Sequence, residues 1–209
     1  MTQPPSKSLV TVANAIKTCQ NCPLGATRSH AVPGQGAFDA KLVFIGEAPG
    51  YHEDRQGTPF VGAAGKLLDS LLAKISLSRS EVFVTNMVKC RPPDNRDPLP
   101  EEISACSSYL ESQIAIVSPQ IIVTLGRHAF GRFFPGESIM QVRGKLRSYG
   151  HLKIFPVLHP AAALYRRELM NVLEEDFSTL RDLLDEYDQS KSLVNQESSD
   201  DDPEQLAMF

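Results

Sequence analysis

Leu42-Val-Phe-Ile-Gly-Glu-Ala-Pro-Gly50 is the stretch that decides the fold, because an apolar run passes directly into glycine, an acid and a Pro-Gly turn. A short run of β-branched and aromatic residues that ends in glycine is typical of a strand buried on both faces. Residues 82–85, 121–125 and 154–158 have the same character. The sequence therefore predicts four buried strands, the first over residues 42–45.

Three stretches between and after these runs have helical periodicity. Residues 62–75 carry leucines at helical spacing, residues 100–117 begin with Pro-Glu-Glu, and residues 164–184 form a third amphipathic stretch. Alternating strands and helices indicate a parallel sheet covered on both faces. We expect an α/β fold, a three-layer α/β/α sandwich around a central four-stranded parallel sheet.

Ligands in such folds bind at the carboxyl ends of the strands. The residues expected at this rim are Gly46-Glu-Ala-Pro-Gly50, Asn86, Gly126-Arg-His128 and His159-Pro160. Their carboxylate, carboxamide and imidazole groups predict a polar site at this edge of the sheet.

The composition excludes several classes of protein. The chain has 209 residues, of which 42% are hydrophobic, enough to bury a core and too many for a wholly disordered chain. No apolar run approaches the ~18–20 residues of a membrane-spanning helix, and the first residues lack the apolar stretch of a secretory signal. We expect a cytoplasmic protein with no membrane contact.

Charge is unevenly distributed behind the net value of −4. Residues 185–204 hold eight acids and one lysine, and Ser, Asp and Gln are frequent from Tyr187 onward. We therefore expect one domain over residues 1–184 and an acidic, disordered tail over residues 185–209. Residues 127–153 hold six basic residues and one acid, a pattern compatible with binding a polyanion and equally with an ordinary solvated face.

Four cysteines follow the pattern Cys19-x2-Cys22 and, much later, Cys90-x15-Cys106. Disulfides are not expected in a cytoplasmic protein, and a thioredoxin-like redox pair would follow a strand in a different arrangement. The close first pair favours four thiolates that hold a metal, with Cys106 as a plain core thiol the alternative. Zinc and a [4Fe–4S] cluster both accept four thiolates, and the wide second spacing favours iron–sulfur.

Six motifs occur in order along the chain between about Cys19 and Leu180. They are Cys19-Gln-Asn-Cys-Pro-Leu-Gly, Val32-Pro-Gly-Gln-Gly, Phe44-Ile-Gly-Glu-Ala-Pro-Gly with the following Glu53-Asp54, Gly57-Thr-Pro-Phe-Val-Gly, Val84-Thr-Asn-Met-Val-Lys-Cys-Arg-Pro-Pro and Val157-Leu-His-Pro-Ala-Ala. Together with the four cysteines, they resemble family 4 uracil-DNA glycosylases, the iron–sulfur branch of the uracil-DNA glycosylase superfamily.

The resemblance implies a DNA repair enzyme that flips uracil out of DNA and hydrolyses its N-glycosidic bond, leaving an abasic site. His159 would donate a hydrogen bond to uracil O2 as negative charge develops there, and Asn86 would bind the uracil edge. Phe60 would stack on the flipped base, and Gly46 belongs to the motif whose backbone cradles it. The plainer alternatives are a structural histidine, an asparagine that fixes a turn and a phenylalanine that packs in the core.

Two glutamates are candidates for activating the water and stabilising the sugar cation. We favour Glu47 for the water and Glu53 for shaping the pocket, and the reverse assignment stays open. No lysine is placed to form a Schiff base, so the resemblance implies a monofunctional glycosylase without lyase activity.

The resemblance also implies residues that hold DNA and the cofactor. Leu164 would fill the hole left by the flipped base and Arg166 and Arg167 would contact phosphates, unless this segment simply begins the last helix. A [4Fe–4S] cluster bound by Cys19, Cys22, Cys90 and Cys106 would act as a structural staple.

The last five residues, Gln205-Leu-Ala-Met-Phe209, resemble the motif by which bacterial repair proteins dock on the sliding clamp. Exposed apolar side chains on an acidic string are otherwise hard to explain. The predicted clamp-binding residues are Gln205, Leu206, Met208 and Phe209. We expect a monomer that acts on uracil-containing DNA at the nucleoid.

Three other functions fit parts of this pattern. A non-catalytic DNA-binding module would keep the fold and the cysteines, but the presence of Glu47, Asn86 and His159 argues against it. The branch that forms a covalent bond with uracil-containing DNA relies on an inserted basic loop, which is absent after Lys89. A zinc-stapled hydrolase of free nucleosides would have no use for the basic residues 127–153.

Overall fold

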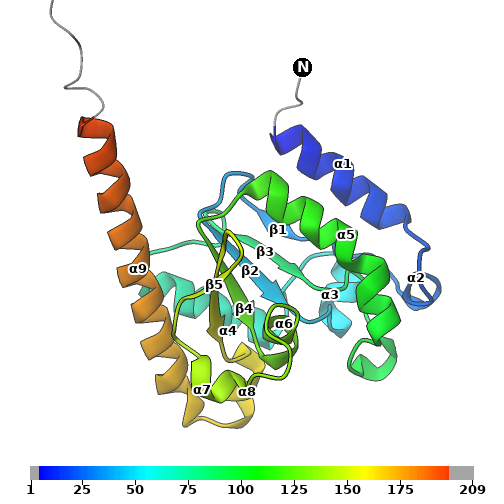
Figure 1. Cartoon of the computed structure of the whole chain (residues 1–209). Helices are drawn as coiled ribbons and strands as arrows, with labels where there is room; N and C mark the ends of the chain where they lie inside the picture. The colour runs from blue at the N-terminus through cyan, green and yellow to red at the C-terminus, as the bar shows by residue number, and fades with distance from the viewer. Residues whose placement is uncertain (1–4, 198–209) are drawn as a thin grey trace, which may run out of the picture.

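The structure, a computed structural model, describes residues 5–197, with side chains over residues 8–189. Its centre is a six-stranded sheet with the order β1-β3-β2-β4-β6-β5 (Figure 1). The four central strands are parallel: β3 (Phe83–Asn86), β2 (Leu42–Gly46), β4 (Ile121–Leu125) and β6 (Leu152–Val157). They match the four strands predicted from the sequence. The prediction succeeded because parallel strands covered on both faces are continuous apolar runs.

Two antiparallel edge strands correct the prediction of a four-stranded sheet. β1 (Gln35–Gly36) pairs with β3, and β5 (Arg147–Tyr149) pairs with β6. β1 has two residues, and a Cβ on Gly36 would lie 1.8 Å from the Val82 carbonyl oxygen, so only glycine allows this approach. Short, polar or glycine-containing edge strands lack the apolar run that identified the central ones.

Helices cover both faces of the sheet, which confirms the three-layer prediction. Leu42 and Phe44 belong to a core cluster shared with α4 (Ala63–Lys74), α8 (Pro160–Tyr165) and α9 (Leu169–Glu197). Val43 and Ile45 alternate with them and belong to a second cluster shared with α5 (Pro100–Val117) and α6 (Arg127–Gly131). α1 (Pro5–Thr18), which was not predicted, lies along α5 on the side of the sheet opposite α9 (Figure 1).

The predicted helix over residues 164–184 is two helices, and the second is longer than expected. α8 ends at Tyr165 and α9 begins at Leu169, with a turn over residues 166–168 that no glycine or proline marks. α9 extends to Glu197, past residue 184, where the sequence placed the end of the helix. The apolar face continues into the acidic run, because Leu183 and Tyr187 both pack against the first core cluster.

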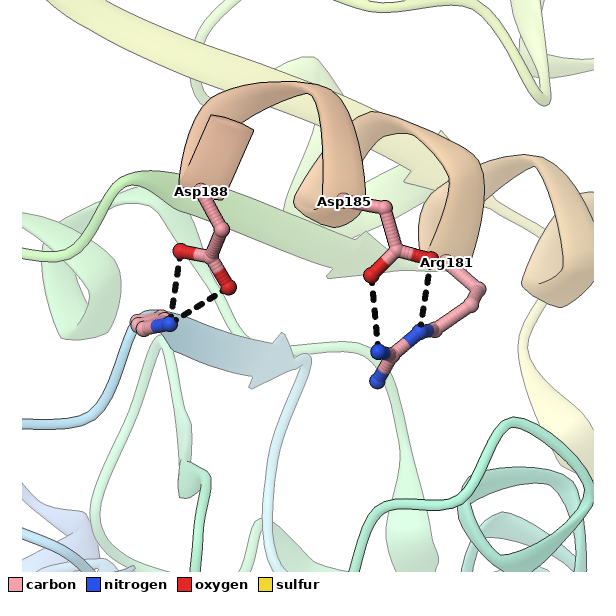
Figure 2. Close-up of polar contacts among 4 residues, drawn as sticks. Arg181, Asp185 and Asp188 are labelled. Carbon is pink, nitrogen blue, oxygen red and sulfur yellow. Dashed lines mark hydrogen bonds and ion pairs between the residues drawn. The ribbon is translucent and has the colours of Figure 1, made fainter. Parts of the chain in front are cut away.

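Ion pairs accompany this extension of α9 (Figure 2). Asp188 accepts hydrogen bonds of 2.6 and 2.7 Å from the ammonium of Lys41, the residue before β2. Asp185 pairs with Arg181 one helical turn earlier, at 2.7 Å. Of these two acids, whose sequence suggested a solvated tail, Asp188 connects α9 to the residue before β2, and Asp185 pairs within the helix.

The remaining described elements are α2 (Leu24–Thr27), α3 (Tyr51–Gln56), the 3-10 turn η1 (Pro93–Asn95) and α7 (Ile139–Val142). Over the described range, no helix has both the length and the apolar character needed to span a membrane. The predicted clamp-binding residues, Gln205 to Phe209, lie outside the described residues.

Candidate active site

A pocket lies at the carboxyl ends of the parallel strands. Across the sheet the parallel strands lie in the order β3, β2, β4 and β6, so the chain passes from β2 to β3 on one side and then to β4 and β6 on the other. The change of direction lies between β2 and β4, which is the usual place for a ligand in an open α/β sheet. The pocket has a volume of about 360 Å³. Its lining residues are Glu47, Ala48, Pro49, Gly50, Glu53, Phe60, Ala64, Asn86, Pro92, Asn95, Arg96, His159 and Ala161.

Asn86, at the end of β3, presents an unsatisfied acceptor at this pocket. The residue is 2% exposed, and its side-chain Oδ1 has no hydrogen-bond partner among the described residues. A Cβ on Gly46 would lie 2.3 Å from this oxygen, so glycine is needed to leave room for it. Because a buried acceptor without a partner costs about 1–3 kcal/mol, the arrangement is typical of a group that waits for a ligand.

Phe60 belongs to the core and the pocket at once. Its ring is 8% exposed, packs in the first core cluster and lies 5.8 Å from the His159 ring, between centroids, at 28°. Its backbone has a φ of +54°, an uncommon conformation for a bulky residue. A Cβ on Gly65 would lie 1.7 Å from the Phe60 carbonyl oxygen, so α4 can approach this loop only through glycine. Strain of this kind is frequent where a ligand is held.

His159 is the residue that precedes α8, and its ring is fixed by the start of that helix. The backbone N–H of Ala161 donates to Nδ1 at 3.2 Å. The proton of the neutral ring therefore sits on Nε2. Removal from water lowers the pKa of His159 to about 4, with Glu53 opposing the shift. At neutral pH His159 is thus an uncharged donor at the pocket.

Glu47 follows β2 and faces a histidine that follows β4. The Glu47 carboxylate lies 3.9 Å from His128 Nε2, and the same nitrogen lies 3.2 Å from the carboxylate of Asp97. Burial raises the pKa of Glu47, His128 and Arg127 oppose the rise, and Asp97 adds to it. A carboxylate with a raised pKa is a better proton acceptor near neutral pH.

Glu53, on α3, holds the opposite wall of the pocket. Its Oε1 accepts hydrogen bonds of 2.9 Å from the backbone N–H groups of Val61 and Gly62, the residues that lead into α4. The neighbouring Asp54 is buried and faces away, where it accepts from the backbone N–H of Ser29 at 2.9 Å. The contacts of Glu53 agree with a role in shaping the pocket.

Comparison with known proteins identifies the family. Residues 33–181 match the family described as the uracil DNA glycosylase superfamily. This chain belongs to the uracil-DNA glycosylase superfamily. It is 50% identical over 186 residues to the type-4 uracil-DNA glycosylase of Sulfurisphaera tokodaii, covering 84% of each chain. The type-4 enzyme of Archaeoglobus fulgidus is 44% identical over 186 residues, 85% of this chain and 94% of the relative.

A type-5 member of the superfamily is less similar. The type-5 uracil-DNA glycosylase of Thermus thermophilus is 36% identical over 116 residues, which cover 48% of this chain and 52% of the relative. The resemblance to the type-4 branch found in the sequence is thereby confirmed.

The four cysteines of this superfamily member line one small cavity beside the pocket strands. They come from three separate segments: Cys19 and Cys22 precede α2, Cys90 follows β3, and Cys106 lies on α5. Arg28 donates from its guanidinium to the Cys90 sulfur at 2.9 Å, and the backbone N–H of Asn21 donates to the Cys19 sulfur at 3.4 Å. Such donors favour thiolates.

The sulfur spacing is wider than one zinc ion requires. Tetrahedral zinc with bonds of ~2.3 Å holds its four sulfurs about 3.8 Å apart. In the described part of the chain, only Glu47, Asp97 and His128 form a group of three or more ligand atoms that all lie within 4.8 Å of one another. No three of the cysteine sulfurs meet that limit, so the donor set fits a larger, multi-iron group better.

The predicted DNA-contacting residues lie together on an exposed segment. Leu164, near the end of α8, is 45% exposed, and Arg166 and Arg167 follow it in the turn before α9. Arg166 pairs with Glu168 at 2.9 Å. The alternative that Leu164 simply begins the last helix is wrong, because it lies near the end of a separate short one.

Most of the basic residues in segment 127–153 form ion pairs with acidic residues of the same chain. The ion pairs are Arg127–Asp97, Arg132–Glu111, Arg143–Asp176 and Arg147–Glu137. All four arginines of this segment have acidic partners, which favours an ordinary solvated face over polyanion binding, the two alternatives that the charge pattern left open.

Sequence reasoning missed two contributors to the site. Asp97, in an irregular loop whose polar sequence gives no periodic signal, lies 3.2 Å from His128 and adds to the rise that burial causes in the pKa of Glu47. Arg28 contacts a cysteine 62 positions away. His128 was expected at the rim but had no assigned role. Only its place after β4 could have indicated that it would face Glu47.

Proposed function

We propose that this protein is a monofunctional glycosylase that removes uracil from DNA and leaves an abasic site. One observation carries the proposal: an unsatisfied acceptor, Asn86 Oδ1, and a neutral donor, His159 Nε2–H, belong to one pocket. The type-4 and type-5 relatives, whose names are uracil-DNA glycosylase, support it.

Asn86 gives the pocket its preference for uracil. Its Oδ1 accepts from uracil N3–H, while its amide group donates to O4. Cytosine has a lone pair at N3 and an amino group at the other position, so both contacts become repulsive. A site whose buried polar atoms are left unpaired by the wrong base rejects that base strongly. Phe60 supplies a ring face for the extruded base, a contact worth about 1–3 kcal/mol.

Cleavage of the glycosidic bond places the bonding electron pair on uracil, and negative charge develops on O2. The neutral His159 donates its Nε2–H to this oxygen, and its preorganisation by the Ala161 N–H costs nothing at the moment of reaction. Because the pKa of His159 is about 4, the ring stabilises the anion as a dipole and keeps its proton.

Glu47 accepts the proton of the water that attacks the sugar, and Glu53 holds the backbone of the opposite wall. The wall of this pocket, as far as the chain is described, contains no lysine. Lys89, three residues after Asn86 in the sequence, is buried, and its ammonium donates hydrogen bonds to Thr85, Asn86 and Gln113. This supports hydrolysis without strand cleavage.

The four cysteines would hold a [4Fe–4S] cluster. Their sulfur spacing, their origin in three segments and the N–H donors from Arg28 and Asn21 support this assignment. When bound, the cluster supplies a rigid cross-link between the segment before α2, the loop after β3 and α5. Base excision itself is left to Asn86 and His159 and to the proton acceptor Glu47.

Replacing Cys106 with serine should lower iron content and soluble yield together, because the ligand set would then be incomplete. Iron per chain and visible absorbance measure the effect. Ser108→Ala, on the exposed side of the same helix, is the matched control and should keep both values. Full iron content in Cys106→Ser with lost excision would contradict a structural role for the cluster.

Leu164, Arg166 and Arg167 would contact the DNA around the extruded base, the leucine as a wedge and the arginines at phosphates. Docking on a sliding clamp through Gln205, Leu206, Met208 and Phe209 stays a prediction of the sequence, as do a monomeric state and a place at the nucleoid.

The proposed function is tested by alkali-dependent cleavage of a labelled oligonucleotide that contains one uracil. We expect cleavage at uracil only after alkali, and none in matched oligonucleotides with thymine or cytosine. Cleavage before alkali would contradict a monofunctional enzyme. No cleavage by iron-replete protein would favour a binding module, and retention of the uracil strand on a denaturing gel would favour the cross-linking branch.

A further inference from the structure

Arg91 is a cation at the edge of the pocket that the proposed reaction does not use. It lies in the loop after β3, and three other residues of that loop, Pro92, Asn95 and Arg96, line the pocket. Its side chain is half-buried, so the guanidinium still meets solvent. A group bound by Arg91 would therefore lie beside the ligand in the pocket.

Two contacts hold the Arg91 guanidinium in place. Its Nε–H donates to the side-chain Oδ1 of Asn95 at 2.7 Å. Its Cζ lies 5.3 Å from the centre of the Tyr51 ring, within the range of a cation–π contact. Tyr51 is 54% exposed and directly follows Gly50, another residue of the pocket lining. The loop after β3 and the start of α3 thus support the same guanidinium.

The loop that carries Arg91 is rigid. Asp94 and Asn95 have φ values of +55° and +53°, a conformation that these two residue types tolerate better than most. The backbone N–H groups of Asn95 and Arg96 donate to the carbonyl oxygens of Pro92 and Pro93, both at 3.1 Å. The two prolines also restrict φ. The guanidinium is therefore positioned before a ligand binds, which lowers the entropic cost of binding.

The charge of Arg91 is not neutralised within the described part of the chain. Arg96, on the same loop, pairs with Glu102 at 2.7 Å, whereas no carboxylate, that of Asp94 included, lies within ion-pair distance of Arg91. Because Asn95 engages only Nε, the two terminal nitrogens of Arg91 have no hydrogen bond to a described residue. A planar guanidinium with free terminal N–H groups matches two oxygens of one phosphate.

We propose that Arg91, supported by Tyr51 and Asn95, binds a backbone phosphate of the DNA strand beside the extruded nucleotide. This inference rests on the proposed function, in which that strand crosses the mouth of the pocket. Arg91 follows β3, and the segment 164–167 proposed to contact DNA comes after β6. These outer parallel strands are three positions apart, or about 14 Å at the usual strand spacing. Arg91 therefore holds the DNA on the flank of the pocket opposite that segment.

The test compares wild type with Arg91→Gln in single-turnover excision from a single-stranded oligonucleotide that contains one uracil. The enzyme concentration for half-maximal rate should rise about 5–20-fold with an unchanged maximal rate, because the contact lies outside the reacting centre. The slope of log affinity against log salt should become shallower by about 0.7, as for one phosphate contact in a single strand. Lys74→Gln removes the same charge at the end of α4 far from the pocket, and this matched control should behave as wild type.

Neutral phosphate analogues identify the contact itself. A methylphosphonate, which lacks the phosphate charge, is placed in turn at each position near the uracil. At one position it should weaken binding by wild type and cause no further loss in Arg91→Gln, the non-additivity expected of a direct contact. Tyr51→Leu should show part of the same loss, about 2–5-fold, and Tyr51→Phe should recover most of it because the ring face is restored.

Equal half-saturating concentrations for Arg91→Gln and Lys74→Gln would overturn the phosphate site, as would additive losses at every methylphosphonate position. A lower maximal rate of Arg91→Gln with unchanged half-saturation would also overturn it, since the arginine would then only support the pocket through Asn95. If the wild type excises no uracil, the proposed function itself fails. Excision by wild type with additive losses rejects the phosphate site alone.

Discussion

Replacing His159 with alanine is expected to slow single-turnover excision of uracil by about 10²–10³-fold, the usual cost of removing one preorganised donor from a developing anion. The fold should survive, because the ring contributes one contact with Phe60 and one hydrogen bond from the Ala161 N–H. The measurement is a rate at saturating enzyme together with the midpoint of thermal unfolding. His151→Ala, at an exposed histidine in the turn before β6, provides the matched control.

The pH dependence of the wild-type rate adds a second readout for His159. Because the pKa of this residue is lowered to about 4, the ring is already neutral at pH 5 and stays so as the pH rises. We therefore expect no loss of rate as the pH passes through ~6.5, where an ordinary histidine loses its proton. A rate that fell there and became flat in His159→Ala would show that the cationic ring is the active form.

Replacing Asn86 with leucine should separate stability from activity. The change removes a buried oxygen that has no partner in the free protein, so the free energy of unfolding should stay level or rise by up to about 1 kcal/mol. Excision of uracil should fall by about 10³-fold or more, since the base then loses both edge contacts. Urea unfolding and single-turnover rates measure the two effects.

Thr124→Val is the matched control for Asn86→Leu. Its Oγ1 is also buried without a partner, but it lies in the middle of the sheet, on β4. The control should show the same direction in stability and the wild-type rate of excision. A large loss of stability in Asn86→Leu would mean that Asn86 mainly fixes the end of β3, which is the plainer interpretation of its sequence position.

Much of this fold could be predicted because the central strands are covered on both faces and are therefore continuous apolar runs. The two edge strands could not be predicted. β1 contains a glycine that is required because its backbone lies close to Val82, and β5 is polar. The full length of α9 could not be predicted, because its last part is rich in acidic residues that are typical of a solvated tail. One of them, Asp188, pairs with Lys41, more than a hundred positions earlier. Local composition cannot report such long-range pairing.

The candidate site was predictable to a similar extent. Glu47, Asn86 and His159 end or follow strands, and the carboxyl ends of parallel strands meet at one edge whatever the rest of the chain does. Asp97 and Arg28 belong to irregular segments, whose positions depend on tertiary contacts rather than on periodicity. The role of Glu53 in holding two backbone amides could not be inferred from its position in a motif.

Glu53 and Asp54 are adjacent, yet one grips the loop before α4 and the other grips Ser29, just beyond the cysteine-bearing segment. The short helix α3 thus connects the segment beside the cysteines with the wall of the pocket. Arg28 extends this connection, because its guanidinium donates hydrogen bonds to the carbonyl oxygen of Cys19 and to the sulfur of Cys90. The position of the pocket wall and the position of the segment that carries Cys19 and Cys22 are therefore connected through hydrogen bonds to adjacent residues of one short helix.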